Sequence, residues 1–256
     1  EQTLVHFQGG DTDGDGYYDV GASTSQATWS TSDWTNYVTA LNNFQSQGVV
    51  VFALSNDDEK TDADISAALP ELFPQLQEAW ITAANVNIAG GAGMNWDSKT
   101  FTLQSAPCGS TAEYCLAGDG YLITLPGSGT VSGNNLGSGN QTYYFTAGTS
   151  FVAPQISGAI AVLANHFPNH TPAQLVDRLL ASANNDSNGA FSQAGTVTFG
   201  NGVVHAYSSE AGHGIMDMLA ALSPITSSSY SRSIYGGAGN LSGQGFELEG
   251  SGLRQS

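Results

Sequence analysis

The segment YYFTAGTSFVAPQISGAIAVLANHF, which spans residues 143–167, decides the fold and sets the candidate site. Its first part favours a strand that breaks at Ala147-Gly148, and its second part predicts a long helix from about Ser150 to Asn165. The apolar side chains that recur at helical spacing in the second part are Ile156, Ile160 and Leu163. We therefore expect a strand, a tight break, and a helix that packs on a core by one face.

The serine that opens this helix has a placement suited to chemistry. The first N–H groups of a helix have no intrahelical acceptor, and the helix dipole adds positive potential at the same end. Ser150 is therefore well placed for a nucleophile whose reaction develops an oxyanion beside it. The alternative from position alone is an ordinary serine cap of the helix.

The preceding residues predict an α/β fold with a parallel sheet flanked by helices. A helix is expected to begin at Ser32 or Asp33 and to stop at Gly48, and the apolar run from Val49 to Leu54 predicts a strand buried on both faces. The segments PELFPQLQEAW and WITAANVN repeat this order of helix and strand. Strand, helix and buried strand in succession favour parallel pairing with helices packed on the sheet.

The chain after the quoted segment predicts two more helices and a tail. One helix should start at Pro172 with Thr171 as its cap, and a last one should cover Ile215 to Leu222. Residues 223–256 are rich in Ser and Gly, which is typical of a linker or an extension. We therefore expect one domain over residues 1–222.

Composition limits the classes of partner. The chain has 5 Lys+Arg against 22 Asp+Glu in 256 residues, a net charge of −17, which disfavours binding to nucleic acid or to an anionic membrane. Hydrophobic residues make up 40% of the sequence, enough for a real core, and no apolar run is long enough for a membrane span. The acidic surface, rich in small polar residues, favours a secreted or cell-surface protein.

Several motifs resemble one enzyme family. GTSFVAP at residues 148–154, followed by a helix with small residues, resembles the serine motif of subtilisin-like proteases. CGSTAEYCLAGDG at residues 108–120 is similar to a segment of autotransporter-type subtilases, with Gly118-Asp119 where Ala-Pro is usual. GHGIMDMLAAL at residues 212–222 resembles the closing helix of the family. The resemblance covers about residues 2–222 and implies the C-terminal two-thirds of a catalytic domain.

The resemblance implies roles for particular residues in peptide hydrolysis. Ser150 would be the nucleophile, and Asn56 would donate to the oxyanion, with Ser55 where the family has Gly. TLVHFQGG at residues 3–10 resembles the strand that pairs with the backbone of a protein or peptide substrate. The residues that would line the cleft are Phe7, Gln8, Gly9, Ala53, Leu54 and Ser55.

The sequence also departs from the family. The Asp-Ser/Thr-Gly and His-Gly-Thr motifs that carry the catalytic Asp and His do not occur, and the His-Gly pair at His213 follows the serine. The resemblance then implies that an N-terminal portion with the Asp and His lies outside this chain, and that the sheet is incomplete on its N-terminal side. The rival interpretation is a protease-like binding or adhesion module without turnover.

The insert DTDGDGYYD, within an acidic stretch of about residues 11–30, has the alternate spacing of a calcium loop. The expected ligands are Asp11, Asp13, Asp15, Tyr17 and Asp19. The terminal bidentate Glu of a full EF-hand is absent, because Ala22 occupies that position. A structural Ca²⁺ is therefore the prediction, and a solvated acidic turn is the alternative.

Two further features of the sequence each admit two interpretations. Cys108 and Cys115 are close enough in sequence to close a small disulfide loop, with two reduced thiols as the alternative. The acidic run at residues 56–64 predicts a solvated loop, or one that borders the cleft and attracts basic residues of a substrate.

Overall fold

The computed structural model describes residues 31–89, 99–121, 123–127, 142–185 and 191–225. By its internal contacts the chain divides into two compact units, residues 1–43 and 44–256. In the first unit the described residues form nearly all of helix α1, Thr31–Phe44. A helix was expected in this segment and is confirmed, although it begins one or two residues before the expected cap.

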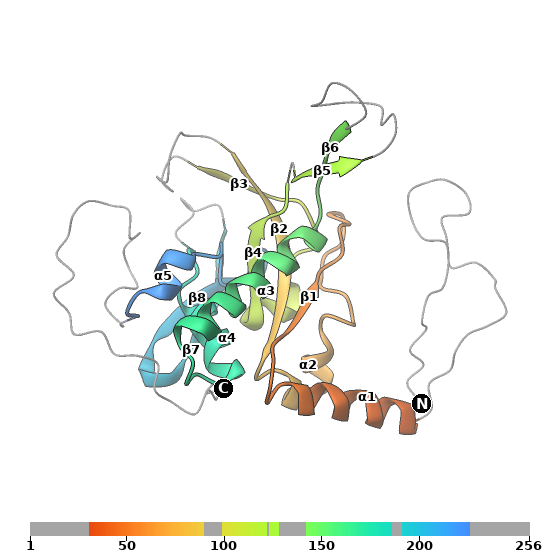
Figure 1. Cartoon of the computed structure of the whole chain (residues 1–256). Helices are drawn as coiled ribbons and strands as arrows, with labels where there is room; N and C mark the ends of the chain where they lie inside the picture. The colour runs from red at the N-terminus through yellow and green to blue at the C-terminus, as the bar shows by residue number, and fades with distance from the viewer. Residues whose placement is uncertain (1–30, 90–98, 122, 128–141, 186–190, 226–256) are drawn as a thin grey trace. The chain divides into compact units, whose positions relative to one another are not determined.

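A mixed sheet forms the centre of the second unit (Figure 1). Its strands are β1 (Val50–Ala53), β2 (Trp80–Ala89), β3 (Thr100–Leu103) and β4 (Cys115–Asp119). Strands β1 and β4 run parallel to β2 on its two sides, whereas β3 is antiparallel to the end of β2. Residues 80–86 of β2 are all buried, as expected for a central parallel strand. The predicted α/β class is confirmed.

Strand β1 is less buried than its sequence predicts. Val50–Ala53 are all half-buried, and only Leu54 directly after the strand is buried, with 2% of its surface exposed. Among the described residues, β1 pairs with β2 alone, so one of its edges receives no ladder hydrogen bonds from them. The apolar run from Val49 to Leu54 did not predict the partial exposure of β1, because the hydrophobicity of a strand does not indicate how many strands pair with it.

The helical segment before β2 is shorter than the sequence pattern suggests. It is divided into α2, Leu69–Leu72, and a 3₁₀ turn, Pro74–Leu76. Phe73 lies between them with an extended backbone, φ −133° and ψ 78°. A residue before proline is disfavoured in the helical region, so Pro74 explains the division.

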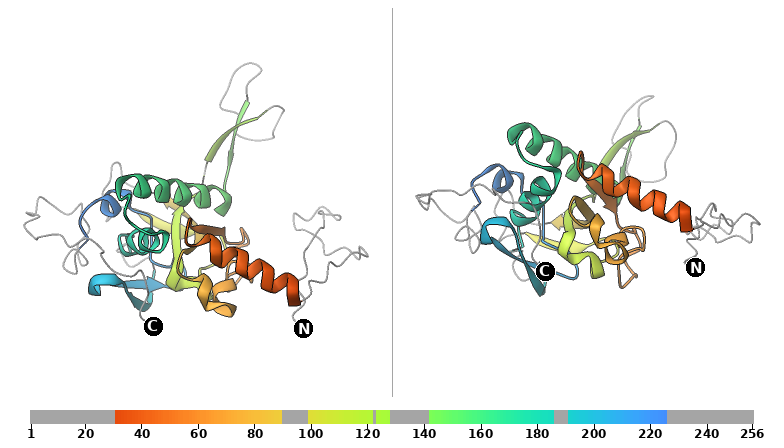
Figure 2. Two further views of the ribbon diagram at one scale, coloured as in Figure 1. Left: turned by 60° about the horizontal axis from the view of Figure 1, so that its bottom comes forward. Right: turned by 90° about the horizontal axis from the view of Figure 1, so that it is seen from below.

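Helix α3, Thr149–His166, lies along the sheet and contacts β1, β2 and β4 (Figures 1 and 2). The expected long helix is confirmed, and its buried face includes Val152, Ile156 and Leu163, none of which exposes any surface. Helix α4, Pro172–Ala181, has Thr171 as its cap, as expected. The Thr171 side chain accepts from the N–H of Gln174, and the Gln174 side chain accepts from the N–H of Thr171.

The last helix, α5, covers only Met218–Leu222, so the expected start at Ile215 was wrong by three residues. The backbone of Ile215 exchanges hydrogen bonds with that of Asn184, which holds this part of the chain extended. Asp217 then caps the helix by accepting from the N–H of Ala220 at 2.9 Å. Most of the predicted tail, residues 226–256, lies outside the described residues, and the boundary at residue 222 stays a prediction.

Two antiparallel hairpins complete the second unit. Strands β5 (Ile123–Gly127) and β6 (Thr142–Thr146) form the first, which leads directly into α3. Strands β7 (Gln193–Thr198) and β8 (Val204–Ser208) form the second, joined by the 3₁₀ turn Gly200–Gly202. A longer 3₁₀ segment, Gly109–Tyr114, precedes β4.

Candidate active site

Ser150 is the second residue of α3 and is exposed. The helix follows β6 after two residues, and the N–H of Phe151 bonds to the carbonyl of Gly148. Pro154 lies inside the helix, where it has no N–H to donate to the carbonyl of Ser150. The backbone N–H of Ser150 is within the first turn, where the helix offers donors to an anion.

Asn56 follows β1 and reaches the start of α3. Its Oδ1 accepts from the N–H of Thr149 at 2.9 Å, across 93 positions of sequence. The hydroxyl of Thr149 lies 2.6 Å from the carbonyl of Leu54 and 3.1 Å from the same Oδ1. These contacts engage Oδ1 of the Asn56 amide. The other end of the amide, Nδ2, is the hydrogen-bond donor that can serve a ligand.

Gly148 allows this close approach. A Cβ atom at this position would lie 3.1 Å from Oδ1 and 3.3 Å from Nδ2 of Asn56, closer than most real Cβ contacts. The peptide group between Gly148 and Thr149 is therefore packed directly on the Asn56 carboxamide. The structure thus places the Asn56 carboxamide against the two residues directly before Ser150, the residue to which the resemblance assigns the role of nucleophile.

The predicted cleft residues at the end of β1 are held by β2 and by the segment that follows β3. The N–H of Leu54 donates to the carbonyl of Ala83, which extends the ladder past Ala53. The carbonyl of Ser55 accepts from the N–H of Ala106, and the Ser55 hydroxyl accepts from the N–H of Asp57. The other predicted cleft residues, Phe7, Gln8 and Gly9, lie outside the described residues, and so does the predicted calcium set Asp11, Asp13, Asp15, Tyr17 and Asp19.

The acidic loop after Asn56 is anchored rather than simply solvated. Asp62 accepts from the N–H of Ser110 at 2.7 Å and from that of Ala63 at 2.7 Å. The hydrogen bond from the Ser110 backbone is the main cause that lowers the pKa of Asp62. Lys60 and Asp64 form an exposed ion pair at 2.6 Å. The loop that carries the predicted oxyanion donor is therefore tied to the segment beside the cysteines.

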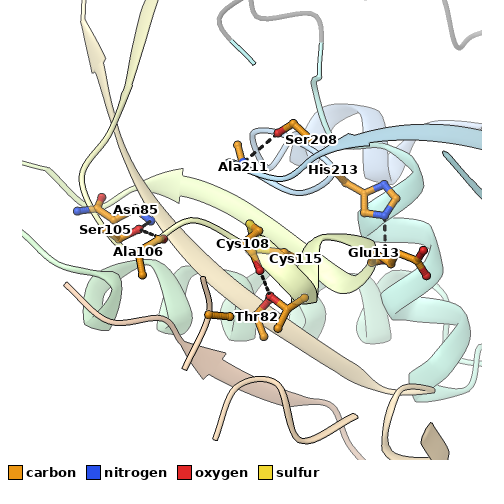
Figure 3. Close-up of a disulfide and its surroundings, with 12 residues drawn as sticks. Thr82, Asn85, Ser105, Ala106, Cys108, Glu113, Cys115, Ser208, Ala211 and His213 are labelled. Carbon is orange, nitrogen blue, oxygen red and sulfur yellow. Dashed lines mark hydrogen bonds between the residues drawn. A yellow bond between two sulfur atoms is a disulfide. The ribbon is translucent and has the colours of Figure 1, made fainter. Parts of the chain in front are cut away.

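The two cysteines form a disulfide (Figure 3). Cys108 and Cys115 are both fully buried, and their Cα atoms are 5.9 Å apart. The disulfide closes the 3₁₀ segment that carries Ser110, so it also limits the movement of the anchor of Asp62. Of the two alternatives for the cysteines, the disulfide is the one that the structure contains.

Two buried histidines lie close to this segment. Nδ1 of His213 is 2.9 Å from Nδ1 of His205. Nε2 of His213 is 3.0 Å from the carbonyl of Glu113 (Figure 3). Burial, with a smaller contribution from the neighbouring His213, lowers the pKa of His205 to about 2. Both ring nitrogens of His213 therefore lie within hydrogen-bond distance of other groups inside the protein.

The described part of the chain contains neither a cluster of metal-binding side chains nor a helix that could span a membrane. No group of three or more His, Cys, Asp or Glu within it could hold a metal ion. No helix within it is both long and apolar enough to cross a bilayer. Neither result bears on the predicted calcium loop, whose residues lie outside that part.

The fold and the site define an α/β protein with an exposed serine at a helix N-terminus beside a carboxamide. Residues 16–214 match the subtilase family of peptidases, so the match covers most of the sequence. The chain belongs to the subtilase family, as its motifs implied.

Two curated proteins have similar sequences. Serotype-specific antigen 1 of Mannheimia haemolytica is 31% identical over 140 residues, which are 54% of this chain and 13% of that protein. An extracellular serine protease of Serratia marcescens is 25% identical over 139 residues, which are 50% of this chain and 12% of that protein. The chain therefore matches only a small part of the length of these relatives.

Among solved structures, fervidolysin from Fervidobacterium pennivorans, a keratinolytic enzyme related to subtilisin, is similar with a TM-score of 0.49 and 24% identity. The similarity covers 76% of this chain and 25% of that chain.

Sequence reasoning gave no role to two polar residues of the site. Thr149 holds the carboxamide of Asn56 by a hydrogen bond. Its position inside the serine motif could have indicated this role from the sequence. Asn85 is a fully buried polar residue in a strand where apolar residues are expected. A polar residue within an otherwise buried strand could have indicated from the sequence that Asn85 has a role.

Proposed function

We propose that this chain is the serine-bearing part of a secreted or cell-surface serine endopeptidase. The observation that carries the proposal is the hydrogen bond between Asn56 Oδ1 and the N–H of Thr149, which holds a carboxamide beside Ser150. Family membership supports peptide-bond hydrolysis, and the curated relative named as an extracellular serine protease supports the location.

In this mechanism the hydroxyl of Ser150 attacks the carbonyl carbon of a peptide bond, and its proton passes to a base. The carbonyl oxygen becomes an oxyanion, which Nδ2 of Asn56 and the backbone N–H of Ser150 would stabilise. The positive end of the α3 dipole adds to this stabilisation. The amine then leaves with a proton from the same base, and water releases the acyl group from Ser150.

The base must come from a portion that carries Asp and His, because this sequence has neither motif. Without a base the serine hydroxyl stays protonated and is a weak nucleophile. We therefore propose that this portion is the functional partner of the chain. A protein or peptide substrate would extend along Phe7, Gln8 and Gly9 on one side and Ala53, Leu54 and Ser55 on the other.

The alternative is a protease-like binding or adhesion module that does not turn over. The missing Asp and His motifs are the observation that favours it. The scaffold would then present the same edge of the sheet to a peptide without cleaving it.

An active-site probe separates the two proposals. A fluorophosphonate should label the full-length protein at Ser150, and Ser150→Ala should abolish both the labelling and the cleavage of a casein substrate. Ser157→Ala is the matched control, because Ser157 is another exposed serine of α3 whose hydroxyl donates to the carbonyl of Ala153. Absence of labelling in the parent protein would support the module, and labelling that persists in Ser150→Ala would refute the assignment of the nucleophile.

A further inference from the structure

Asn85 is a fully buried polar residue of β2 that joins three segments of the chain. Figure 3 shows its contact with Ser105, which belongs to one of them. Its N–H donates to the hydroxyl of Ser105 at 3.0 Å, and its carbonyl accepts from the N–H of Gln104 at 2.8 Å. Its side-chain Oδ1 accepts from the N–H of Gly120 at 2.8 Å. One residue thus ties β2 to the segment after β3 and to the end of β4.

Gly120 transmits this connection to the turn before α3. Its carbonyl accepts from the N–H of Gly148 at 3.0 Å. A Cβ atom on Gly120 would lie 2.5 Å from the carbonyl oxygen of Gly148, 2.8 Å from Oδ1 of Asn85 and 2.9 Å from a methyl group of Val152. Gly120 is therefore hydrogen-bonded to the turn before the helix, and there is no room for a side chain between them.

We propose that Asn85 is a positioning residue for Ser150, acting through Gly120 and Gly148, an inference that rests on the proposed function. Gly148 directly precedes the first residue of α3 and is packed on the carboxamide of Asn56. The turn that Asn85 fixes therefore sets the position of the nucleophile relative to its oxyanion donor.

The energetics of the side chain support a role as acceptor. Nδ2 of Asn85 is buried and has no hydrogen-bond partner among the described residues, which is unfavourable for folding. A leucine of similar size would bury no unpaired donor, but it would leave the N–H of Gly120 without its acceptor. The asparagine thus contributes its side-chain oxygen, which accepts the hydrogen bond from the N–H of Gly120 in this turn.

The test compares two substitutions at Asn85 in the full-length protein. Asn85→Leu removes the acceptor, whereas Asn85→Asp keeps an oxygen of the same geometry. Peptides that span residues 116–121 and 146–152 should exchange amide hydrogen at least about tenfold faster in the leucine variant. Its kcat should fall by about 10- to 100-fold, with KM changed by less than about twofold. The aspartate variant should keep exchange rates within about threefold of the parent.

Thr171→Ala is the control, because it removes a helix cap at α4 and so lowers stability without touching this turn. Unchanged exchange in Asn85→Leu, or equal acceleration in Asn85→Asp or Thr171→Ala, would overturn the proposal. If the leucine variant does not fold, Asn85→Ala is measured in the same way, and failure of both to fold assigns Asn85 to the folding core and overturns the proposal. A parent protein without peptidase activity would count against the proposed function, whereas hydrogen exchange would still decide the positioning role.

Discussion

Acidification from pH 8 to pH 5 should destabilise this protein through the buried side chain of His205. The ring exposes 1% of its surface, and its nitrogens lie 2.7 Å from the carbonyl of Ala206 and 3.0 Å from that of Ala183. Burial is the largest cause that lowers its pKa to about 2. The folded protein therefore keeps this imidazole neutral at pH values where an unfolded chain protonates it.

The size of the effect follows from the two pKa values. The unfolded histidine has a pKa of about 6.5, so between the two values the unfolded state binds one more proton than the folded state. The free energy of unfolding then falls as the pH falls, by up to about 1.4 kcal/mol per unit. Between pH 8 and pH 5 the loss is about 2 kcal/mol, a large fraction of the stability of an ordinary domain.

Urea unfolding at pH 8, 6.5, 5.5 and 5 measures this loss. The window stays above the ordinary pKa values of Asp and Glu, so most carboxylates remain ionised throughout. His205→Gln keeps a polar side chain that does not titrate, and it should remove most of the dependence on pH. His166→Gln, at an exposed position, should leave it unchanged. Equal slopes for His205→Gln and the parent protein would refute the reasoning.

The remaining predictions concern the proposed oxyanion donor, the disulfide and the predicted calcium site. Under the proposed function, Asn56→Leu should lower the kcat of the full-length protein by about 10²- to 10³-fold, with KM almost unchanged, because that is the cost measured for the loss of such a donor in subtilisin. A fall below threefold in steady-state kinetics would exclude the role. Replacing Cys108 and Cys115 by alanine should lower the free energy of unfolding by about 2–3 kcal/mol, because the two cysteines are only seven residues apart. Equal denaturation midpoints with and without the bond would contradict this estimate. Chelator should lower the melting temperature, and Asp13→Ala should remove most of that sensitivity; a melting temperature that chelator leaves unchanged would argue against bound calcium.

The sequence predicted the elements whose periodicity is strong. The helix that begins near Ser150 and the cap at Thr171 follow from local spacing, and both are present in the structure. The helix expected from Ile215 begins later because its backbone pairs with Asn184, a contact made in three dimensions. Local patterns do not contain such pairings.

In the candidate site, too, the sequence predicted the features that depend on local motifs but not the contacts between distant residues. The serine motif and the strand before Asn56 led to Ser150 and Asn56, and the structure bonds the Asn56 carboxamide to Thr149, the residue directly before Ser150. The anchor from Asp62 to Ser110 spans 48 positions, and nothing in the acidic run distinguished Asp62 from its neighbours. Contacts between a carboxylate and a distant backbone N–H leave no periodic pattern in the sequence, so only the structure reveals them.

The C-terminal end of the described chain has a consequence for anyone who shortens this protein. The buried guanidinium of Arg178 donates to the carbonyls of Ala221 at 2.6 Å and Ser223 at 2.7 Å, and it stacks 3.8 Å from the ring centre of Phe167. A version cut after Leu222 would keep every residue of α5 but lose one oxygen that a buried cation uses. Shortened forms for expression or crystallisation should therefore extend at least to Ile225, which is itself 5% exposed.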